Sequence, residues 1–271
     1  MATKHAQGAQ DSPATMPPQH QARQPGREGE MHPRPQSFAE HYVGAGRLRG
    51  KVALVTGGDS GIGRAAAIAF AKEGADVAIA FLEECEDARQ TRAAIEACGR
   101  RALSVAVDLG DEAACAALIE RVVRELGALD VLVNNAAEQH PQESIADLSA
   151  AQLERTFRTN VFAMFHCVKA ALPHLKAGAR IINTSSVTAY QGSAHLLDAV
   201  GRLEAAQALA NVVEKVRFAV LAVVHHVDAG LDLLRDHLEH GRADARRPRR
   251  LVDRLTALLR PVHFQEVGRP R

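Results

Sequence analysis

After residue 50, short apolar runs alternate with longer segments in which apolar positions recur at helical spacing. The short runs are typical of buried parallel strands, and the longer segments are typical of amphipathic helices. The predicted strands are 52–55, 76–80, 102–107, 131–133 and 180–183. The predicted helices are 62–72, 84–97, 113–125 and 152–175, with Asp111 placed to cap the third. This repetition predicts an α/β fold, a doubly wound parallel sheet of the Rossmann-like kind, with ligands at the carboxyl ends of the strands.

The two ends of the chain do not follow this pattern. Residues 1–45 are rich in Gln, Pro, His and Gly and poor in aliphatic side chains, which predicts a disordered tail before a folded domain at 46–198. Residues 199–271 contain no glycine-punctuated strand-turn-helix units, and we interpret them as a divergent C-terminal segment that is helical in part. Within it, 199–213 and 231–240 are helix candidates and 217–224 is a strand candidate.

Composition narrows the function classes. The chain has 271 residues, 46% of them hydrophobic, and a formal net charge of +1, so charge gives no general attraction to nucleic acid or membrane. Neither a membrane-spanning run nor a secretion signal is visible, which predicts a cytoplasmic protein. The four cysteines show no metal-binding spacing, and we interpret them as reduced thiols. The arginine-rich run 243–250 lacks interleaved aromatics and indicates solvated surface rather than a nucleic-acid site.

A glycine-rich turn follows the first predicted strand and leads into the first predicted helix. A phosphate-binding turn needs glycine for a tight bend, for close approach of the backbone to a pyrophosphate, and for packing of helix on strand. Gly57, Gly61 and Gly63 meet these needs, and the helix amino terminus supplies amide donors. The turn therefore predicts dinucleotide binding, with Asp59, Ser60, Ile62 and Arg64 in the same segment.

The spacing of this turn, T-G-x-x-x-G-I-G, resembles that of the short-chain dehydrogenase/reductase family. Further segments match in order: Asp108-Leu109, Asn134-Asn135-Ala136-Ala137, Asn160 between Thr159 and Val161, and Ser186 after Thr184-Ser185. The resemblance covers about residues 24–198 and is closest to the branch of glucose/ribitol dehydrogenase-like and general-stress-type oxidoreductases. Taken singly, each match has a structural alternative, such as a strand-end tie for Asn135 or a turn cap for Asp108.

The resemblance implies an NAD(P)-dependent oxidoreductase that transfers hydride between a nicotinamide and a small alcohol or carbonyl compound, such as a sugar or polyol. It implies that Ser186 bonds the substrate carbonyl and that Asn160 holds a proton-relay water. It assigns cofactor contacts to the glycine-rich turn and to Asp108, Leu109, Asn135 and Ala136. Family members form tetramers through the helix that bears Y-x-x-x-K, so the resemblance leaves a homo-oligomer open where that helix is altered; no metal is expected, because the cysteines, and His237 with His240, lack the partners of a metal site.

Two residues that this chemistry needs are missing from the sequence. The family's tyrosine and lysine, written Y-x-x-x-K, fall at positions that here hold Ala199 and Leu203. The chain's two tyrosines, Tyr42 and Tyr190, stand elsewhere, and the closing strands of the family sheet are not visible in the last third. We therefore expect an oxidoreductase with impaired catalysis; the alternatives are a non-catalytic NAD(P)-binding protein and a truncated or frameshifted gene product.

Cofactor choice depends on the end of the second predicted strand. Phe81-Leu82-Glu83 stands there in place of an aspartate that would bind both ribose hydroxyls, and Arg64 is close enough in the pattern to meet a 2′-phosphate. The sequence therefore slightly favours NADP over NAD.

Overall fold

The computed structural model describes residues 25–142 and 144–186, residues 17, 19–21 and 23, and the backbone of the strand 217–223. These ranges include the five strands predicted between residues 52 and 183 and the glycine-rich turn. The helix candidates 199–213 and 231–240 lie outside the described residues, as do Tyr190, Ala199 and Leu203.

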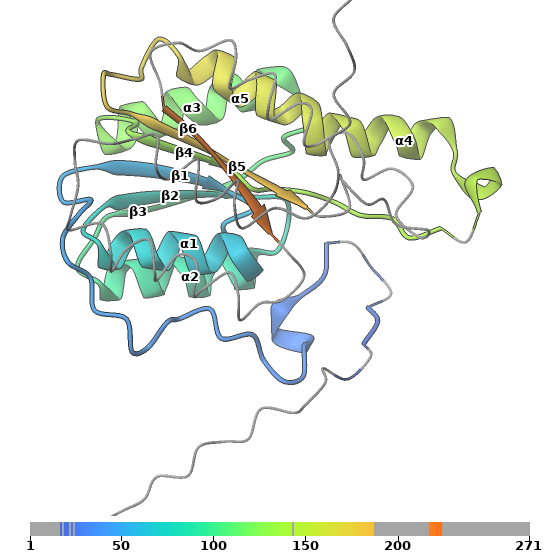
Figure 1. Cartoon of the computed structure of the whole chain (residues 1–271), viewed down its shortest axis with the longest axis horizontal. Helices are drawn as coiled ribbons and strands as arrows, with labels where there is room; N and C mark the ends of the chain where they lie inside the picture. Colours follow the sequence, from blue (N-terminus) through green and yellow to red (C-terminus); the bar gives the residue numbers. More distant parts are fainter. Residues whose placement is uncertain are drawn as a thin grey trace, which may run out of the picture. The chain divides into compact units, whose positions relative to one another are not determined.

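A sheet of six parallel strands forms the centre of the fold (Figure 1). The strands are β1 (Val52–Thr56), β2 (Asp76–Phe81), β3 (Ala102–Ala106), β4 (Val131–Asn134), β5 (Arg180–Ser186) and β6 (Arg217–Val223), in the order β3-β2-β1-β4-β5-β6. Ala53 of β1 pairs with Val77 of β2 on one side and with Val131 of β4 on the other. The strand order thus reverses between β1 and β4, which is where a doubly wound sheet binds its ligand. The predicted fold class is confirmed.

Helices cover both faces of this sheet, which explains why its strands are apolar on both sides. The helices are α1 (Gly61–Lys72), α2 (Cys85–Ala97), α3 (Glu112–Leu126), α4 (Ala150–Phe157) and α5 (Ala163–Ala171). Figure 1 shows α1 and α2 on one face and α3 and α5 on the other. As predicted, Asp111 caps α3: its carboxylate accepts the amide of Ala114 at 2.8 Å.

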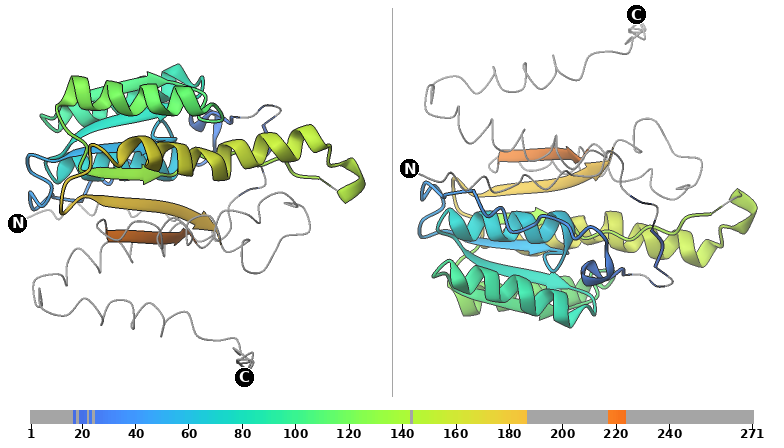
Figure 2. Two further views of the ribbon diagram at one scale, coloured as in Figure 1. Left: turned by 90° about the horizontal axis from the view of Figure 1, so that it is seen from above. Right: turned by 90° about the horizontal axis from the view of Figure 1, so that it is seen from below.

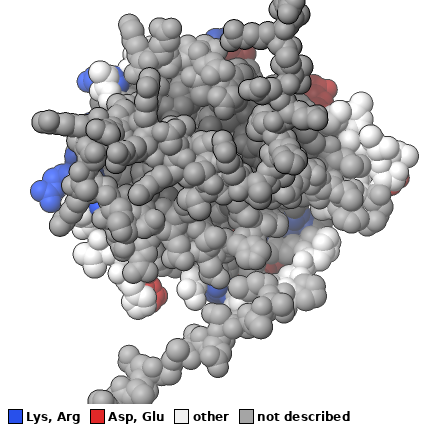
Figure 3. Space-filling view, viewed as in Figure 1, with Lys and Arg blue, Asp and Glu red and all other residues white. Residues whose placement is uncertain are grey.

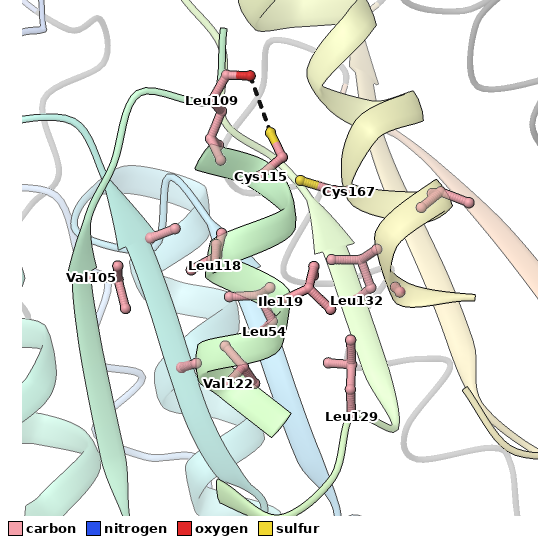
Figure 4. Packing of buried hydrophobic residues seen from close by; sticks show 14 of the residues in the cluster. Leu54, Val105, Leu109, Cys115, Leu118, Ile119, Val122, Leu129, Leu132 and Cys167 are labelled. Carbon is pink, nitrogen blue, oxygen red and sulfur yellow. Dashed lines mark hydrogen bonds between the residues drawn. The ribbon is translucent and has the colours of Figure 1, made fainter. Parts of the chain in front are cut away.

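The core between α3, α5 and the sheet is apolar (Figure 4). Leu118, Ile119 and Val122 of α3 are buried in one cluster with Leu54 and Leu132 of the strands. Apolar residues three and four positions apart on a helix share one face, so the sequence pattern of α3 leads directly to this packing.

The predicted helix 152–175 is interrupted in its middle. A π-helical segment, η3 (Arg158–Phe162), separates α4 from α5. Such wide turns are found mostly where a helix is adapted to a functional site. Here the segment contains Asn160, which is only 4% exposed.

The second half of the predicted disordered tail is folded onto the domain, so the prediction does not hold for residues 25–45. Figure 2 shows this segment running past α1, with a short 3₁₀ helix, η1 (Glu28–Glu30). Its chain passes so close to α1 that a Cβ on Gly44 would lie 1.9 Å from the carbonyl oxygen of Lys72. The hydroxyl of Tyr42 donates to Glu73, whose carboxylate also accepts the amide of Arg47 at 2.8 Å. Composition alone misses such contacts because they are made by single residues far apart in sequence.

The expectation that both closing strands of the sheet are absent also needs correction. Strand β6 occupies most of the predicted strand 217–224 and lies parallel to β5. Its backbone register pairs Arg217 with Arg180 and Val223 with Ser186. The sheet therefore continues at least one strand beyond β5, in a region where the sequence shows no family motif.

The described side chains that are visible in Figure 3 include both basic and acidic residues, which lie around the edge of the view. In the part of the chain that the structure describes, no helix is long and apolar enough to cross a membrane. The same residues contain no group of three or more His, Cys, Asp or Glu side chains arranged to hold a metal ion.

Candidate dinucleotide-binding site

A cavity of about 360 Å³ opens at the carboxyl ends of the strands, over the point where the strand order reverses. Its walls come from segments that are distant in sequence. They are the glycine-rich turn after β1, the end of β2, residues 107–109 after β3, residues 135–139 after β4, Thr184 and Ser185 of β5, and Arg155, Thr159 and Asn160 from α4 and η3. Pro25 of the N-terminal segment completes the wall.

The glycine-rich turn can be made only with glycine at several positions. Gly57 has φ +61° and Gly61 has φ +52°, a backbone conformation that disfavours side chains with a Cβ. A Cβ on Gly63 would lie 1.9 Å from the carbonyl oxygen of Gly57, and one on Gly58 would lie 2.6 Å from Ile79. Helix α1 begins immediately after this turn, so the amides of its first turn have no partner within the helix. The Gly61 amide is bonded to the Glu28 carboxylate, and the amides that follow it are suited to an anion.

A hydrogen-bonded network ties the turn to β4 and β5. The hydroxyl of Thr56 accepts the amides of Asn135 and Ala136 at 2.8 and 3.0 Å. The side-chain amide of Asn135 donates to the carbonyls of Thr56 and Gly57, and its oxygen accepts the hydroxyl of Thr184 at 3.1 Å. Asn135 therefore fastens three strand ends together, as its structural alternative implies, and it also lines the cavity.

Arg64 does not take the position that the sequence suggested. Its side chain is 2% exposed and pairs with Glu28 at 2.7 Å and with Asp87 at 3.2 Å. Its Nε donates to the carbonyl of Asp59 at 2.8 Å and to the hydroxyl of Thr91 at 2.9 Å. All of these contacts are with α2, the N-terminal segment and the carbonyl of the turn. Arg64 therefore does not line the cavity. Of the two sequence-based reasons for favouring NADP, the position of Arg64 is therefore removed, and the residues at the end of the second strand remain.

Glu28 is the partner that the sequence did not reveal. Its carboxylate accepts the amide of Gly61 at 2.5 Å, the guanidinium of Arg64 at 2.7 Å and the hydroxyl of Ser37 at 3.0 Å. The phosphate turn is therefore supported by a buried anion from the N-terminal segment. A glutamate in a polar, proline-rich stretch gives no pattern that would have indicated this role.

Asp59 and Ser60 lie in the turn and line the cavity together with Ile62. The Asp59 side chain is buried, and this burial raises the pKa of its carboxyl group. Ser60 precedes α1 at the capping position, but its hydroxyl makes no capping hydrogen bond. The Ser60 side chain instead forms a hydrogen bond with the Asp59 carboxyl group, next to the helix amino terminus.

Charged side chains that pair with one another line the part of the cavity wall formed by α4 and by the loops after β3 and β4. Arg155 of α4 pairs with Asp108 at 2.7 Å and with Glu138 at 3.2 Å, and all three residues line the cavity. The hydrogen bond from Arg155 holds the pKa of Asp108 below its usual value. Asp108 also accepts the amide of Gly110 at 2.9 Å, so it caps a turn while facing the cavity with Leu109.

Asn160 lines the cavity and fixes its wall. Its side-chain oxygen accepts the amide of Glu138 at 2.9 Å, and its side-chain nitrogen donates to the carbonyl of Glu138 at 2.8 Å. This paired contact joins the π-helical segment to the loop after β4. A relay water held by the Asn160 side chain would have to share these two bonded atoms.

The end of β5 carries the serines of the predicted site. Ser186 is the last residue of β5, as the sequence predicts, and its backbone pairs with Val223; the structure describes nothing further of its side chain. Ser185 lines the cavity with a hydroxyl that is buried and has no hydrogen-bond partner among the described residues. A buried hydroxyl without a partner is costly, so this group is suited to bond a ligand.

These features together fit a dinucleotide. The glycines allow a tight turn that Cβ atoms at Gly58 and Gly63 would prevent. The amides that follow Gly61 at the start of α1 have no partner within the helix, and the Ser185 hydroxyl has no partner among the described residues. Nine of the predicted residues line the cavity: Gly57, Asp59, Ser60, Ile62, Asp108, Leu109, Asn135, Ala136 and Asn160. Gly61, Gly63 and Arg64 support the turn from behind it. Pro25, Glu84, Glu138, Arg155 and Ser185 are lining residues that the sequence did not single out.

Comparison with known proteins agrees with the class that fold and site define. The family model for short chain dehydrogenases matches residues 51–197. The chain is 59% identical over 181 residues to the uncharacterized oxidoreductase YhdF of Bacillus subtilis, which covers 67% of this chain and 63% of that protein. It is 52% identical over 186 residues to General stress protein 39 of the same organism, with coverages of 69% and 65%. It is 48% identical over 188 residues to the glucose and ribitol dehydrogenase of Daucus carota, with coverages of 67% and 65%.

Solved structures give the same result. A short chain dehydrogenase from Burkholderia cenocepacia in complex with NADP shares 37% identity at a TM-score of 0.61, covering 66% of this chain and 74% of that one. The NADH-dependent reductase A1-R′ complexed with NAD shares 25% identity at a TM-score of 0.61, with coverages of 66% and 80%. The chain belongs to the short-chain dehydrogenase/reductase family. It spans less than two thirds of the length of the three curated relatives.

Proposed function

We propose that this chain binds NAD(P) in the cavity over the glycine-rich turn, and that it is an oxidoreductase of small alcohols or carbonyl compounds, such as sugars or polyols, with impaired catalysis. The observation that carries the proposal is the cavity itself, which joins the glycine turn to the ends of β4 and β5. The names of the similar proteins support the substrate class, since one of them is a glucose and ribitol dehydrogenase. We place the protein in the cytoplasm, as a homo-oligomer, with no nucleic-acid or membrane partner.

Each wall of the cavity has a part in holding the dinucleotide. The amides at the start of α1, with Ser60 and Ile62, receive the pyrophosphate, and Asp108 and Leu109 border the adenine. Asn135 and Ala136 line the path toward the nicotinamide, and Ser185 offers its hydroxyl at the end of β5. Ser186 bonds the substrate carbonyl, and Asn160 orients the wall beside it. The bound nicotinamide supplies or accepts the hydride.

Among the described residues that line the cavity, there is no tyrosine or lysine to carry the proton of the substrate oxygen. A phenol with a lowered pKa is the usual group for this step in the family, and Ala199 and Leu203 stand where the tyrosine and lysine would be. Tyr42 does not replace it: burial and the Glu73 carboxylate raise the pKa of Tyr42 to about 12, and its hydroxyl is bonded to Glu73 behind α1. Loss of a general acid-base group lowers turnover by roughly 10²–10⁴-fold.

The second candidate is a non-catalytic NAD(P)-binding protein. The specific observation in its favour is the same replacement at positions 199 and 203. The two candidates differ in turnover and agree in binding, so both require the dinucleotide site.

Titration of the purified full chain with NADPH and NADH tests this site. The chain has no tryptophan, so cofactor fluorescence gives a signal free of tryptophan emission. We expect saturable binding that Ser60→Glu weakens at least tenfold, because a carboxylate at the helix start repels the pyrophosphate. Ser60→Gln is the matched control, since it has a similar size without the charge. A chain that binds neither dinucleotide contradicts the proposal.

Turnover with sugars, polyols and aldehydes then separates the two candidates. We expect rates at least 10²-fold below those of the carrot glucose and ribitol dehydrogenase assayed in parallel. We expect the double change Ala199→Tyr and Leu203→Lys to recover little activity, because the sequence around these positions also departs from the family. A wild-type rate equal to that of the carrot enzyme contradicts the impairment, and a complete absence of turnover with intact binding supports the second candidate.

A further inference from the structure

We propose that Arg23, from the N-terminal segment, is a specificity-determining residue of the cofactor site and admits a phosphate on the 2′ oxygen of the adenosine ribose. The proposal rests on the proposed dinucleotide binding and deepens it. It assigns to this segment the recognition of the 2′-phosphate, which Arg64 cannot perform because it is buried in ion pairs with Glu28 and Asp87.

The relevant corner of the cavity lies at the end of β2. Phe81, Leu82 and Glu84 line the cavity there, beside Ser60 of the turn. In dinucleotide folds the second strand ends next to the adenosine ribose, where an acidic residue about 20 positions after the glycines bonds the 2′-hydroxyl and a nearby arginine accepts a 2′-phosphate. Glu83 and Glu84 stand at this distance from Gly63.

Arg23 and Glu83 are not among the residues that line the cavity, but Arg23 borders this corner through its contact with the lining residue Glu84, 61 positions away in sequence. Its Nη2 donates to Glu83 and, at 3.0 Å, to Glu84. The two carboxylates have different surroundings: the side chain of Glu83 is 56% exposed, and that of Glu84 is 3% exposed. Arg23 itself is 42% exposed, so its guanidinium is open to a ligand as well as to the two carboxylates.

The charges of this corner decide what can bind. Two adjacent carboxylates, Glu83 and Glu84, repel a 2′-phosphate unless a cation stands between them and the ligand. Arg64 is buried in its own pairs with Glu28 and Asp87 and cannot serve. Arg23 contacts both carboxylates and therefore lowers the negative potential at the ribose.

Rearrangement of Arg23 toward a phosphate costs little. Its pair with Glu83 is exposed, and exposed ion pairs contribute little free energy. A guanidinium forms two parallel hydrogen bonds with a phosphate, which are stronger than a solvated pair with a carboxylate. Arg23 can thus exchange Glu83 for a 2′-phosphate, and NAD, which lacks this group, gains nothing from the exchange.

The part of the N-terminal segment from Pro25 onward is attached to the phosphate turn. Pro25 lines the cavity, and the buried Glu28 is bonded to Gly61, Arg64 and Ser37. The backbone amide of Glu28 also donates to Asp87 at 3.1 Å. Arg23 stands two positions before this attached part, and its own contacts are those with Glu83 and Glu84.

The test compares dissociation constants of NADP and NAD for the full chain at fixed ionic strength. We expect Arg23→Gln to weaken NADP about tenfold, the scale of one charge-assisted hydrogen bond, and to change NAD by less than about twofold. Arg23→Lys keeps the charge and retains part of the NADP affinity. Glu83→Gln removes a repelling carboxylate and shifts the ratio in the opposite direction. The same ranking is expected for the fragments 2′-phosphoadenosine 5′-phosphate and AMP, which lack the nicotinamide.

Arg27→Gln is the matched control, because Arg27 lies in the same segment and forms an exposed ion pair with Glu30 at 3.4 Å. The inference is overturned if Arg23→Gln weakens NADP and NAD equally, or changes neither, while both still bind. If wild-type protein binds neither dinucleotide, the proposed function has failed first, and this result is distinct from an unchanged ratio. Circular dichroism of each variant shows whether a loss of affinity comes from a loss of folding.

Discussion

The two faces of the sheet are covered in different ways. On the α3 and α5 side, the contacts are apolar and come from helical periodicity, as Leu118, Ile119 and Val122 show (Figure 4). The thiols of Cys115 and Cys167 lie within this cluster, and both are buried. A hydrogen bond with Cys115 and burial raise the pKa of Cys167, so these thiols serve as core atoms.

On the α1 and α2 side, small apolar residues such as Ala67 and Ala71 pack on the strands. Glu28, Arg64 and Asp87, which we call the buried ion cluster, lie at the end of this face next to the cavity. One of its members comes from the N-terminal segment, so this face depends on a contact between residues 36 positions apart. The α3 and α5 face is therefore stabilised by apolar side chains at helical spacing. The α1 and α2 face is stabilised in part by ionic contacts that also hold the phosphate turn, through the bond between Glu28 and Gly61.

The largest effect is expected from Arg64→Met. Removal of the guanidinium leaves the carboxylates of Glu28 and Asp87 buried without their cation, which costs about 3–5 kcal/mol. Urea unfolding of the full chain at neutral pH measures this loss. The control is Arg89→Met, whose ion pair with Glu86 is exposed, so its loss is expected to leave the free energy of unfolding nearly unchanged. If the two variants had equal free energies of unfolding, the buried ion cluster would contribute no more to stability than an exposed ion pair does.

The α3 and α5 face gives the contrasting case, Ile119→Ala. Ile119 is fully buried in the apolar cluster and does not line the cavity. The variant should lose about 3 kcal/mol of unfolding free energy through lost burial and a cavity. Its dissociation constant for NADPH should stay within about twofold of wild type, since no contact of the site is altered. If affinity fell along with stability, the two faces would not be separable in the way that we describe.

The same contrast explains what the sequence could predict. The five strands between residues 52 and 186 and the cap at Asp111 follow from periodicity and local hydrogen bonding, and the structure confirms them. The three glycines of the turn are recognisable because a tight turn restricts residue type. The prediction that Arg64 meets a 2′-phosphate is wrong, because a motif gives the position of a residue in sequence but not the direction of its side chain. The contacts of Glu28 and Arg23 escape prediction because nothing local indicates partners 36 or 60 positions away.

Glu28→Ala should lower the free energy of unfolding and also weaken NADPH binding. Ile119→Ala, on the α3 and α5 face, is expected to affect only the first of these. Its carboxylate bonds Gly61 and Arg64, and loss of charge-assisted hydrogen bonds of this kind costs about 2 kcal/mol. Because Gly61 is part of the phosphate turn, the dissociation constant for NADPH should rise about tenfold as well. Isothermal titration calorimetry and urea unfolding give the two numbers.

Two controls bring out the role of the charge. Glu30→Ala removes a neighbouring carboxylate whose ion pair with Arg27 is exposed, so neither quantity should change measurably. Glu28→Gln keeps an acceptor for the Gly61 amide and should retain more affinity than Glu28→Ala. If Glu28→Ala left NADPH binding intact, the coupling between the N-terminal segment and the phosphate turn would be refuted.

The smallest effect is expected from pH, at the second attachment of the N-terminal segment. Burial alone would raise the pKa of Glu73, but hydrogen bonds from Tyr42 and from the amides of Arg47 and Ala45 outweigh it and lower the pKa. A lowered folded-state pKa contributes stability above the unfolded-state value, about pH 4.3, and this stability is lost as pH falls through the folded-state pKa. The stability difference between wild type and Glu73→Gln should therefore be constant from pH 5 to 7 (an approximate window) and shrink toward pH 3. Glu40→Gln, at an exposed site on the same segment, provides the control for general charge effects. A difference that stayed the same at about pH 3 would show that the ionised Glu73 carboxylate does not hold this segment to α1.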